Sequence, residues 1–334
     1  MSKQPNISVA VITYNQQATI RQTLDSIVAQ QGDFTLEVVI GEDCSTDDTH
    51  AICEEYEARY TTIKLLSNSH NLGIVANFTR TMAACTGDFV AICAGDDYWC
   101  DPKKLQKQLD YFSAHPEVGV VSTSGYRYYV QRNEMVPGIA PLRPIENGDI
   151  KSFYFSPSYA GGVYAMPLSL LIRRDLLQHV DLDEFVRRGF PVEDYPMQAV
   201  LAQYTRWGHI PDLCVVYRVY KESATFVTPA HPNYLFYHRG LADIRRYLNE
   251  LFPADACVAE AQLQEYVFYK EFLLYLHHLN YKSAKALIAH HSPIIEHSDK
   301  LRKAKIYTRT WLHFIAAHYI KEYRYKQYET FNHT

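Results

Sequence analysis

Three apolar runs that end in polar residues decide the fold: ISVAVITYN at 7–15, EVVIGED at 37–43 and FVAICAGDD at 89–97. Short runs rich in β-branched residues are typical of buried strands. Helical patterns lie between them, so the alternation predicts βαβ units and a parallel sheet covered on both faces. The expected strands are Ile7–Thr13, Leu36–Glu42, Ile63–Ser67, Phe89–Ala94 and Val118–Ser122, and the expected helices between them are Ala18–Gln30, Asp47–Tyr60, Val75–Cys85 and Lys103–Ala114.

The pattern changes after residue 122. Residues 125–165 are rich in Gly, Pro, Tyr and Ser, which predicts strands joined by long loops. Helices are then expected at Leu168–His179 and Pro196–Tyr204, with a strand at Leu213–Tyr220. From Tyr234 the chain is predicted to be mostly helical, with helices at Tyr234–Leu251, Val258–Leu279, Ser283–His290 and Leu301–Tyr328.

The composition is that of an ordinary globular chain of 334 residues, with 47% hydrophobic and 21% charged residues. A net charge of −4 argues against a general nucleic-acid binder. The seven cysteines form no CxxC pair, so buried thiols in a reducing cytoplasm are favoured over disulfides or a zinc site. No signal peptide is visible, and the apolar piece Trp311–Ile320 is too short to span a bilayer.

Residues 299–334 differ from the rest in charge. They contain eight Lys or Arg and three Asp or Glu, a net charge of +5, together with aromatic and aliphatic residues at helical spacings. Such a basic amphipathic helix can lie on an anionic membrane surface. It can equally pack its apolar stripe on the N-terminal part of the chain or on a second subunit, and amphipathicity does not separate these alternatives.

Polar side chains follow three of the predicted strands. Ligands of open parallel sheets bind at the carboxyl ends of the strands, so these residues are expected at one site. Neither GxGxxG nor GxxxxGK[ST] is present, which argues against a Rossmann dehydrogenase or a P-loop NTPase. Carboxylates cannot hold a diphosphate directly, but they can hold Mg²⁺ or Mn²⁺, which bind phosphates. The residues are Thr13, Tyr14 and Asn15 after the first strand, Glu42 and Asp43 after the second, and Gly95, Asp96 and Asp97 after the fourth.

Each acidic pair also has a structural interpretation. Glu42 and Asp43, followed by Ser45, could serve only to cap a helix. Asp96 and Asp97 could lie in a solvated turn. Their occurrence after two strands, behind Thr13-Tyr14-Asn15, favours a binding site for a phosphorylated ligand held through a divalent cation.

The run from ISVAVITYN through EVVIGEDCSTDDT and NLGIVANFTRT to GDDYWCDPKKL resembles the inverting bacterial glycosyltransferases of family 2 over about residues 6–225. The resemblance implies an α/β GT-A fold, the Rossmann-like, mostly parallel sheet of nucleotide-diphospho-sugar transferases, with a helical C-terminal region. The catalytic domain would cover residues 1–225, with a donor half at 1–122 and an acceptor half at 123–225. The helical region would cover 226–334.

The resemblance also implies roles for the donor residues. Tyr14, flanked by Thr13 and Asn15, would lie against the nucleotide base. Asp43 would hydrogen-bond the base edge, with Glu42 as its substitute. Asp96 would contact the ribose or the metal, and Asp97 would be the principal ligand of Mn²⁺ or Mg²⁺. The chain departs from a common form of the family at Ala94, where an acidic residue is frequent, which leaves the ribose contact open.

On the acceptor side, the resemblance implies that Asp194, with Glu193 beside it, is the general base. Two acidic residues at the start of a helix can instead serve its dipole. Gly161 and Gly162 match an acceptor-side loop, although ordinary turn glycines are the alternative. Arg218 could assist the diphosphate or be a surface strand residue. Tyr220 replaces a histidine of many relatives, so a histidine contact with metal or phosphate is not expected.

The predicted function is metal-dependent sugar transfer with inversion, from a nucleotide sugar to a saccharide or lipid-linked acceptor. Uridine is the family's commonest base. The setting implied is the assembly of bacterial cell-surface polysaccharide on the cytoplasmic side of the membrane. The C-terminal helices could make peripheral contact with the membrane or form a homo-oligomer. The rivals are a non-catalytic sugar- or nucleotide-binding partner and a sugar-nucleotide pyrophosphorylase, whose Gly-rich loop is missing. The adjacent histidines at 277–278 and 290–291 point in different directions on a helix and make no natural chelate.

Overall fold

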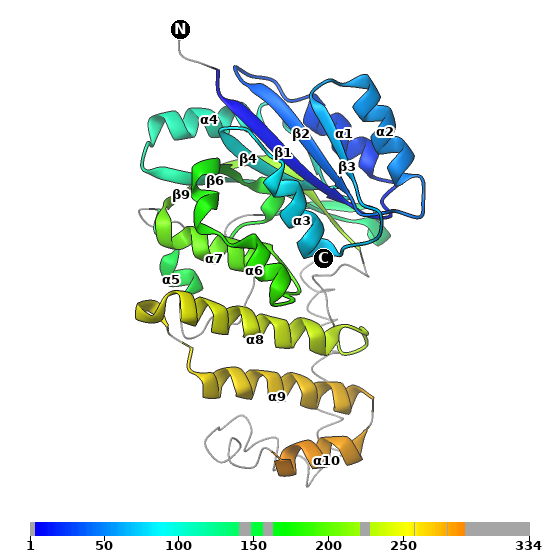
Figure 1. Cartoon of the computed structure of the whole chain (residues 1–334), viewed down its shortest axis with the longest axis vertical. Coiled ribbons are helices and arrows are strands. Elements are labelled where there is room, and N and C mark those ends of the chain that lie inside the picture. Colours follow the sequence, from blue (N-terminus) through cyan, green and yellow to red (C-terminus); the bar gives the residue numbers. More distant parts are fainter. Residues whose placement is uncertain are drawn as a thin grey trace. The chain divides into compact units, whose positions relative to one another are not determined.

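The computed structural model describes residues 4–139, 148–155, 163–220, 228–256, 258–278 and 280–290. Backbone contacts divide the chain into two units, residues 1–224 with 247–257, and residues 225–246 with 258–334. The first unit contains the sheet, and the second contains helices only among its described residues (Figure 1).

The strands and helices of the first unit alternate through residue 114, as the apolar runs predict. These elements are β1 (Asn6–Thr13), α1 (Ile20–Val28), β2 (Thr35–Glu42), α2 (Thr49–Arg59), β3 (Ile63–Ser67), α3 (Ile74–Ala83), β4 (Phe89–Ala94), β5 (Tyr98–Trp99) and α4 (Lys104–Ala114). The elements that follow are β6 (Val118–Tyr129), β7 (Glu134–Ile139), α5 (Lys151–Tyr154), β8 (Leu171–Arg173), α6 (Leu182–Arg187), α7 (Asp194–Tyr204) and β9 (Arg206–Val219).

The described strands form one sheet in the order β3-β2-β1-β4-β8-β6-β9-β5, with β7 paired to β6. The pairings β1–β2, β1–β4, β2–β3 and β6–β9 are parallel. The pairings of β8 with β4 and β6, of β5 with β9 and of β7 with β6 are antiparallel. The mostly parallel sheet and the helices around it are those of the GT-A fold, as expected.

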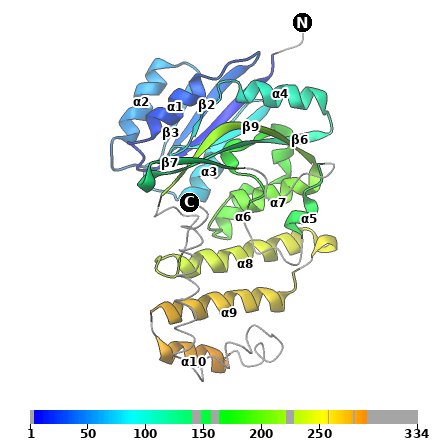
Figure 2. The same ribbon diagram turned by 180° about the vertical axis from the view of Figure 1, so that it is seen from behind.

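Both faces of the sheet are covered. On one face, Ile7, Val9 and Val11 of β1 share a fully buried cluster with residues of α1, α2 and α4. On the other face lies α3, whose Phe78 and Met82 are buried (Figures 1 and 2). The chain runs from β1 through β2 to β3 in one direction along the sheet and then returns past β1 to β4. Because crossovers between parallel strands are right-handed, α1 and α2 cover one face of the sheet and α3 covers the other.

The predicted helix at Leu168–His179 is wrong. Residues 171–173 form β8, which lies between β4 and β6, with short 3₁₀ helices at Pro167–Ser169 and Arg174–His179 on either side. Leu170, Leu171 and Ile172 are fully buried. Periodicity does not distinguish helix from strand in a short apolar run of this kind. Here the residues form a strand because they can pair with β4 on one side and β6 on the other.

The second unit, taken by itself, includes most of α8 (Tyr234–Leu251) and all of α9 (Glu260–His277) and α10 (Tyr281–His290). Phe268 and Phe272 of α9 pack with Ala284 and Ile288 of α10. Within the described residues, no helix combines the length and the apolar character needed to cross a bilayer. The predicted helix Leu301–Tyr328 lies outside the described residues.

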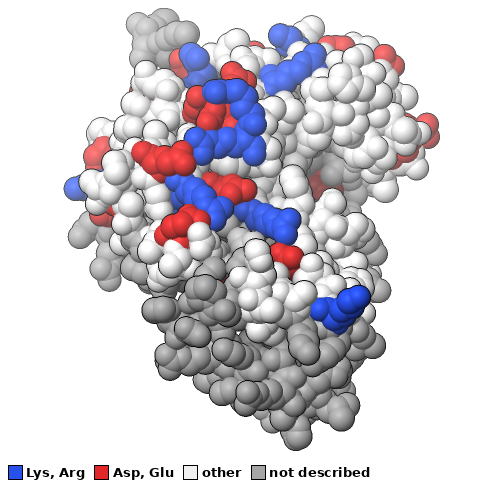
Figure 3. All heavy atoms as spheres, turned by 60° about the horizontal axis from the view of Figure 1, so that its bottom comes forward, with Lys and Arg blue, Asp and Glu red and all other residues white. Residues whose placement is uncertain are grey.

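Charged side chains are mixed on the face shown in Figure 3, where basic and acidic residues lie side by side. Basic and acidic side chains of the first unit also form ion pairs. Arg187, the last residue of α6, and Arg188 after it both contact Glu184, and Arg188 also contacts Glu250 at 2.8 Å. The described part of this face therefore offers no extended surface of a single sign.

Candidate active site

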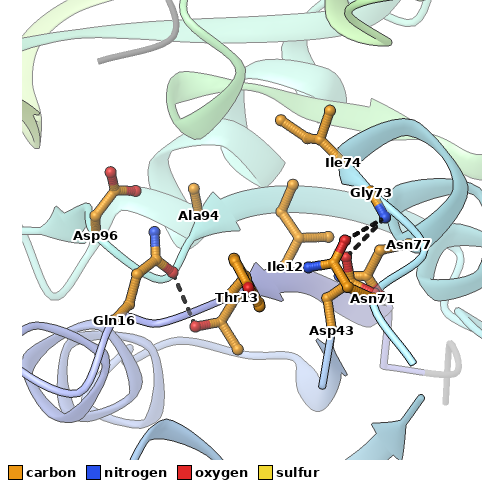
Figure 4. A pocket seen from close by; sticks show the side chains of 11 residues that line it. Ile12, Thr13, Gln16, Asp43, Asn71, Gly73, Ile74, Asn77, Ala94 and Asp96 are labelled. Carbon is orange, nitrogen blue, oxygen red and sulfur yellow. Dashed lines mark hydrogen bonds between the residues drawn. The ribbon is translucent and has the colours of Figure 1, made fainter. Parts of the chain in front are cut away.

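A cavity of about 390 Å³ opens at the carboxyl ends of β1, β2 and β4 (Figure 4). It lies where the order of the strands reverses on either side of β1, the usual ligand site of such sheets. The start of α3 supplies the remaining wall. The lining residues are Ile12, Thr13, Tyr14, Gln16, Asp43, Asn71, Gly73, Ile74, Asn77, Ala94 and Asp96.

The end of β1 brings an aromatic ring to this cavity. Tyr14 is 43% exposed and lines the cavity, so its ring is available to a planar ligand. Thr13 beside it is buried, and its hydroxyl donates to Gln16 Oε1 at 2.8 Å. Asn15 has a positive φ of 52°, and its Oδ1 accepts from the backbone N–H of Thr46 at 2.8 Å. Asn15 therefore connects the loops after β1 and β2 and does not line the cavity.

The two acidic residues after β2 have different partners. Asp43 lines the cavity, and its Oδ1 accepts from Leu72 N at 2.8 Å, while its Oδ2 accepts from Gly73 N at 2.9 Å. Glu42 is buried away from the cavity, where Oε1 accepts from Ser45 N at 2.7 Å and Oε2 lies 3.0 Å from His50 Nδ1. Of the two, Asp43 is the one placed to meet a ligand.

The acidic turn after β4 also separates its two carboxylates. Asp96 lines the cavity and hydrogen-bonds the Gln16 side chain. Asp97 is buried, is not among the lining residues, and accepts the backbone N–H of Arg218 at 2.8 Å. Burial raises the pKa of both carboxyls, and the neighbouring charge of Asp96 raises the pKa of Asp97 further.

Gly95 is required at this turn for steric reasons. A Cβ there would lie 2.4 Å from Gln16 Oε1 and 2.7 Å from Thr13 Oγ1. The absence of a side chain lets β4 approach the end of β1, which brings Asp96 beside Tyr14 in one cavity.

Arg218, near the end of β9, lies beneath the acidic turn. Its guanidinium donates to the carbonyl oxygen of Asp96 and to Gln22 Oε1. The side chain is 6% exposed, so it is not the surface strand residue that was the alternative.

Glu193 and Asp194 lie at the start of α7 and do not line the donor cavity. Glu193 is buried and Asp194 is half-buried, with its Oδ1 accepting the N–H of Tyr195 at 2.7 Å. Burial raises the pKa of both carboxyls. Gly161 and Gly162, predicted on the acceptor side, lie outside the described residues.

No group of three or more His, Cys, Asp or Glu residues in the described ranges is arranged to enclose a metal ion. Two carboxylates line the cavity: Asp43, whose oxygens accept backbone N–H groups, and Asp96, with Asp97 next to it in the chain. This donor set suits a hard cation that completes its coordination with water and with substrate phosphates.

The sequence did not predict six of the lining residues: Ile12, Gln16, Asn71, Gly73, Ile74 and Asn77. Asn71, Ile74 and Asn77 come from the loop before α3 and from its first turns. Asn77 Nδ2 donates to the carbonyl oxygen of Gly41 at 2.8 Å, which ties α3 to β2. The signal that could have found them is the run NLGIVAN at 71–77, where a glycine precedes a helix that faces the ends of the strands.

The chain is similar to several known proteins. The family model described as glycosyl transferase family 2 matches residues 8–180. An uncharacterized protein of Mycobacterium tuberculosis is 44% identical over 115 residues, 34% of this chain and 33% of its own length. A Bacillus subtilis protein named for teichuronic acid biosynthesis, the glycosyltransferase TuaG, is 32% identical over 107 residues, 32% of this chain and 42% of its own length. The chain thus matches less than half the length of these relatives.

Among solved structures, the Pyrobaculum calidifontis mannosyltransferase PcManGT, in complex with GDP-Man and Mn²⁺, superposes with a TM-score of 0.52. The two chains are 18% identical, and the match covers 95% of this chain and 87% of that one. At this identity the similarity shows the shared fold.

Proposed function

The chain belongs to glycosyl transferase family 2, and we propose that it moves a sugar from a UDP-sugar to a saccharide or lipid-linked acceptor by metal-dependent single displacement. The observation that carries the proposal is the cavity in which the exposed ring of Tyr14, the carboxylate of Asp43 and the carboxylate of Asp96 meet. An aromatic ring can stack on a base, and the two carboxylates offer a hydrogen-bond acceptor and a cation ligand.

The hydrogen bonds of Asp43 favour uracil over guanine. A carboxylate has about four acceptor positions, and three are used here by Leu72 N, Asn68 Nδ2 and Gly73 N. The single remaining position matches the one ring N–H of uracil, whereas guanine presents two adjacent donors. Uracil is thus the base that this acceptor fits.

Asn71 strengthens this assignment. Gly73 N also donates to Asn71 Oδ1 at 3.0 Å, so the Asn71 amide lies next to Asp43. Its Nδ2 has no partner within the described residues. An acceptor on Asp43 beside a donor on Asn71 complements the N–H and an adjoining carbonyl of uracil.

The residues also fit a divalent cation. Mn²⁺ or Mg²⁺ would be held by Asp96 and the adjacent Asp97, and burial of these carboxylates favours a bound positive charge. When bound, such an ion supplies Lewis-acid neutralisation of the nucleoside diphosphate. In the archaeal mannosyltransferase of the same fold, Mn²⁺ accompanies the sugar nucleotide.

For the transfer step we assign the general base to Asp194. A single displacement requires an acceptor hydroxyl to lose its proton as it attacks the anomeric carbon, which inverts the configuration. Burial raises the pKa of Asp194 above its ordinary range. A carboxylate with a raised pKa is a stronger base and accepts the proton more readily. Glu193, which is buried next to Asp194 in the chain, would help to orient the Asp194 carboxylate.

The acceptor class is proposed from the relatives. The name of TuaG links that protein to teichuronic acid biosynthesis, and we propose bacterial surface saccharide synthesis as the setting of this chain. The catalytic domain would comprise residues 1–225, with Gly161 and Gly162 on the acceptor side.

A thermal-shift panel tests the donor assignment. We expect UDP and UDP-sugars to raise the melting temperature in Mn²⁺ and not in EDTA, and GDP and GDP-mannose to give a smaller shift. Equal stabilisation by GDP and UDP would contradict the counting of acceptors at Asp43. A UDP-sugar that raises the melting temperature of the protein is then incubated with an acceptor. Chromatography of the product tests transfer, and its anomeric configuration tests inversion.

A further inference from the structure

The backbone of the acidic turn is fixed from two sides. Thr19 Oγ1 lies 2.8 Å from the carbonyl oxygen of Gly95, and Thr23 Oγ1 lies 2.6 Å from that of Asp97. Both hydroxyls belong to α1 or its N-cap. The carbonyl between them, that of Asp96, accepts from the guanidinium of Arg218. Each carbonyl of Gly95–Asp97 therefore has a donor.

Arg218 is itself anchored on three sides. Its second guanidinium nitrogen donates to Gln22 Oε1 on α1, and the guanidinium carbon lies 4.8 Å from the centroid of the Tyr98 ring. Its backbone N–H donates to Asp97 Oδ1 at 2.8 Å. For this buried guanidinium to reach a phosphate, it would have to leave an amide, a carbonyl and an aromatic face.

We propose that Arg218 is a positioning residue that fixes the Gly95–Asp97 turn for the divalent cation and does not contact the donor diphosphate itself. The inference rests on the proposed metal-dependent function. The guanidinium orients the turn through the Asp96 carbonyl, and its charge beneath the two carboxylates reduces their mutual repulsion. Partners that orient metal ligands in this way typically contribute about 10- to 100-fold to metal affinity.

Direct measurement of Mn²⁺ binding tests this role. The free-Mn²⁺ EPR signal is followed as Mn²⁺ is titrated into the full chain with UDP, for the wild type, Arg218→Met and Gln22→Leu. Gln22 is exposed, so Gln22→Leu removes one anchor of Arg218 without disturbing the core. Arg173→Met is the matched control. Arg173 Nε donates to the Val118 carbonyl oxygen at 2.9 Å, and its guanidinium lies 4.8 Å from the Phe112 ring centroid, away from the acidic turn.

We expect the Mn²⁺ dissociation constant to rise about 10- to 100-fold in Arg218→Met. It should rise by a smaller factor in Gln22→Leu and stay unchanged in Arg173→Met. The KM for the UDP-sugar at saturating Mn²⁺ should change little in all three. If Arg218→Met does not fold, Gln22→Leu decides alone.

Two results overturn the inference, and they differ in what they say of the proposed function. If the wild type retains Mn²⁺ and both variants bind it equally well, the positioning role is wrong, and a raised KM for the UDP-sugar would place Arg218 on the donor. If the wild type itself retains no Mn²⁺ with UDP, the metal-dependent function fails as well.

Discussion

Asp43→Asn is the substitution that most directly probes how the donor site is built. Asp43 is 3% exposed, and its carboxylate accepts from Asn68 Nδ2 at 2.8 Å, Leu72 N at 2.8 Å and Gly73 N at 2.9 Å. These donors all belong to the segment between β3 and α3. The same side chain therefore fixes this loop and presents the remaining acceptor position to the base.

The cost follows from these bonds. An amide keeps one acceptor oxygen, so the two bonds to Oδ1 persist without charge assistance and each loses about 1 kcal/mol. The amide nitrogen replaces Oδ2 and meets Gly73 N donor to donor. That contact costs about 1 kcal/mol more, since Gly73 N keeps its bond to Asn71 Oδ1. The sum is about 3 kcal/mol, or about 6–12 °C in melting temperature for a unit of this size.

Thermal unfolding without ligand measures this effect, and Asp96→Asn is the matched control. Asp96 lines the same cavity, but burial already raises the pKa of its carboxyl, so neutralising it should leave the melting temperature unchanged or slightly higher. Asp43→Asn should also lose UDP binding, because the amide no longer accepts the base N–H at the position of Oδ2. A melting temperature for Asp43→Asn within about 2 °C of the wild type would refute the reasoning.

Further substitutions test the other assignments. Asp97→Asn should abolish transfer and leave the melting temperature nearly unchanged, because the amide oxygen can still accept the Arg218 N–H. Wild-type activity that persists in EDTA would contradict the role of a metal. Asp194→Asn should lower the rate of transfer ~10²–10⁴-fold and leave donor binding intact. The wild-type rate should rise with pH across the acidic range, because burial raises the pKa of this base. A rate that does not change with pH would contradict the role of Asp194 as the general base. Burial raises the pKa of Glu193, so the folded state holds a proton that the unfolded state releases, and wild-type stability should fall as pH rises from about 4 to about 8. Glu193→Gln should show a weaker fall and melt higher than the wild type at the alkaline end, which a pH series of melting temperatures checks. Gly95→Ala should weaken UDP binding, because a Cβ there would lie 2.7 Å from Thr13 Oγ1 and 2.9 Å from Thr13 Cβ. Gly138→Ala, whose Cβ would have no neighbour nearer than 3.6 Å, is the control for stability.

The first four parallel strands and the site at their ends could be predicted from the sequence because two independent patterns agree. Apolar β-branched runs separated by helical patterns admit few arrangements other than a parallel sheet, and the polar residues follow those runs directly. Tyr14, Asp43 and Asp96 were predicted at the donor site and line one cavity in the structure.

The remainder depends on contacts between distant parts of the chain. Whether residues 171–173 form a strand depends on the space between β4 and β6, which no local pattern contains. Arg218 is 121 residues from Asp97, and the sequence suggested that it assists the diphosphate or lies on the surface of a strand, not that it is buried against the acidic turn. Its partners, a carbonyl, a glutamine and a tyrosine ring, carry no signature in the sequence.

The two acidic pairs show why neighbours of the same charge have different roles. Only one member of each pair lines the cavity, while the other has a hydrogen bond to the protein backbone; for Asp97 this bond is made by Oδ1, and the proposed cation site also uses this carboxylate. Glu42 binds Ser45 N and Asp97 binds Arg218 N, whereas Asp43 and Asp96 line the cavity. The cavity thus presents two carboxylates to a donor that carries a diphosphate. A diphosphate can bind beside these carboxylates only if positive charge lies between them. Because the guanidinium of Arg218 is already engaged by the Asp96 carbonyl and Gln22, a divalent cation at Asp96 is the source of positive charge that this arrangement requires.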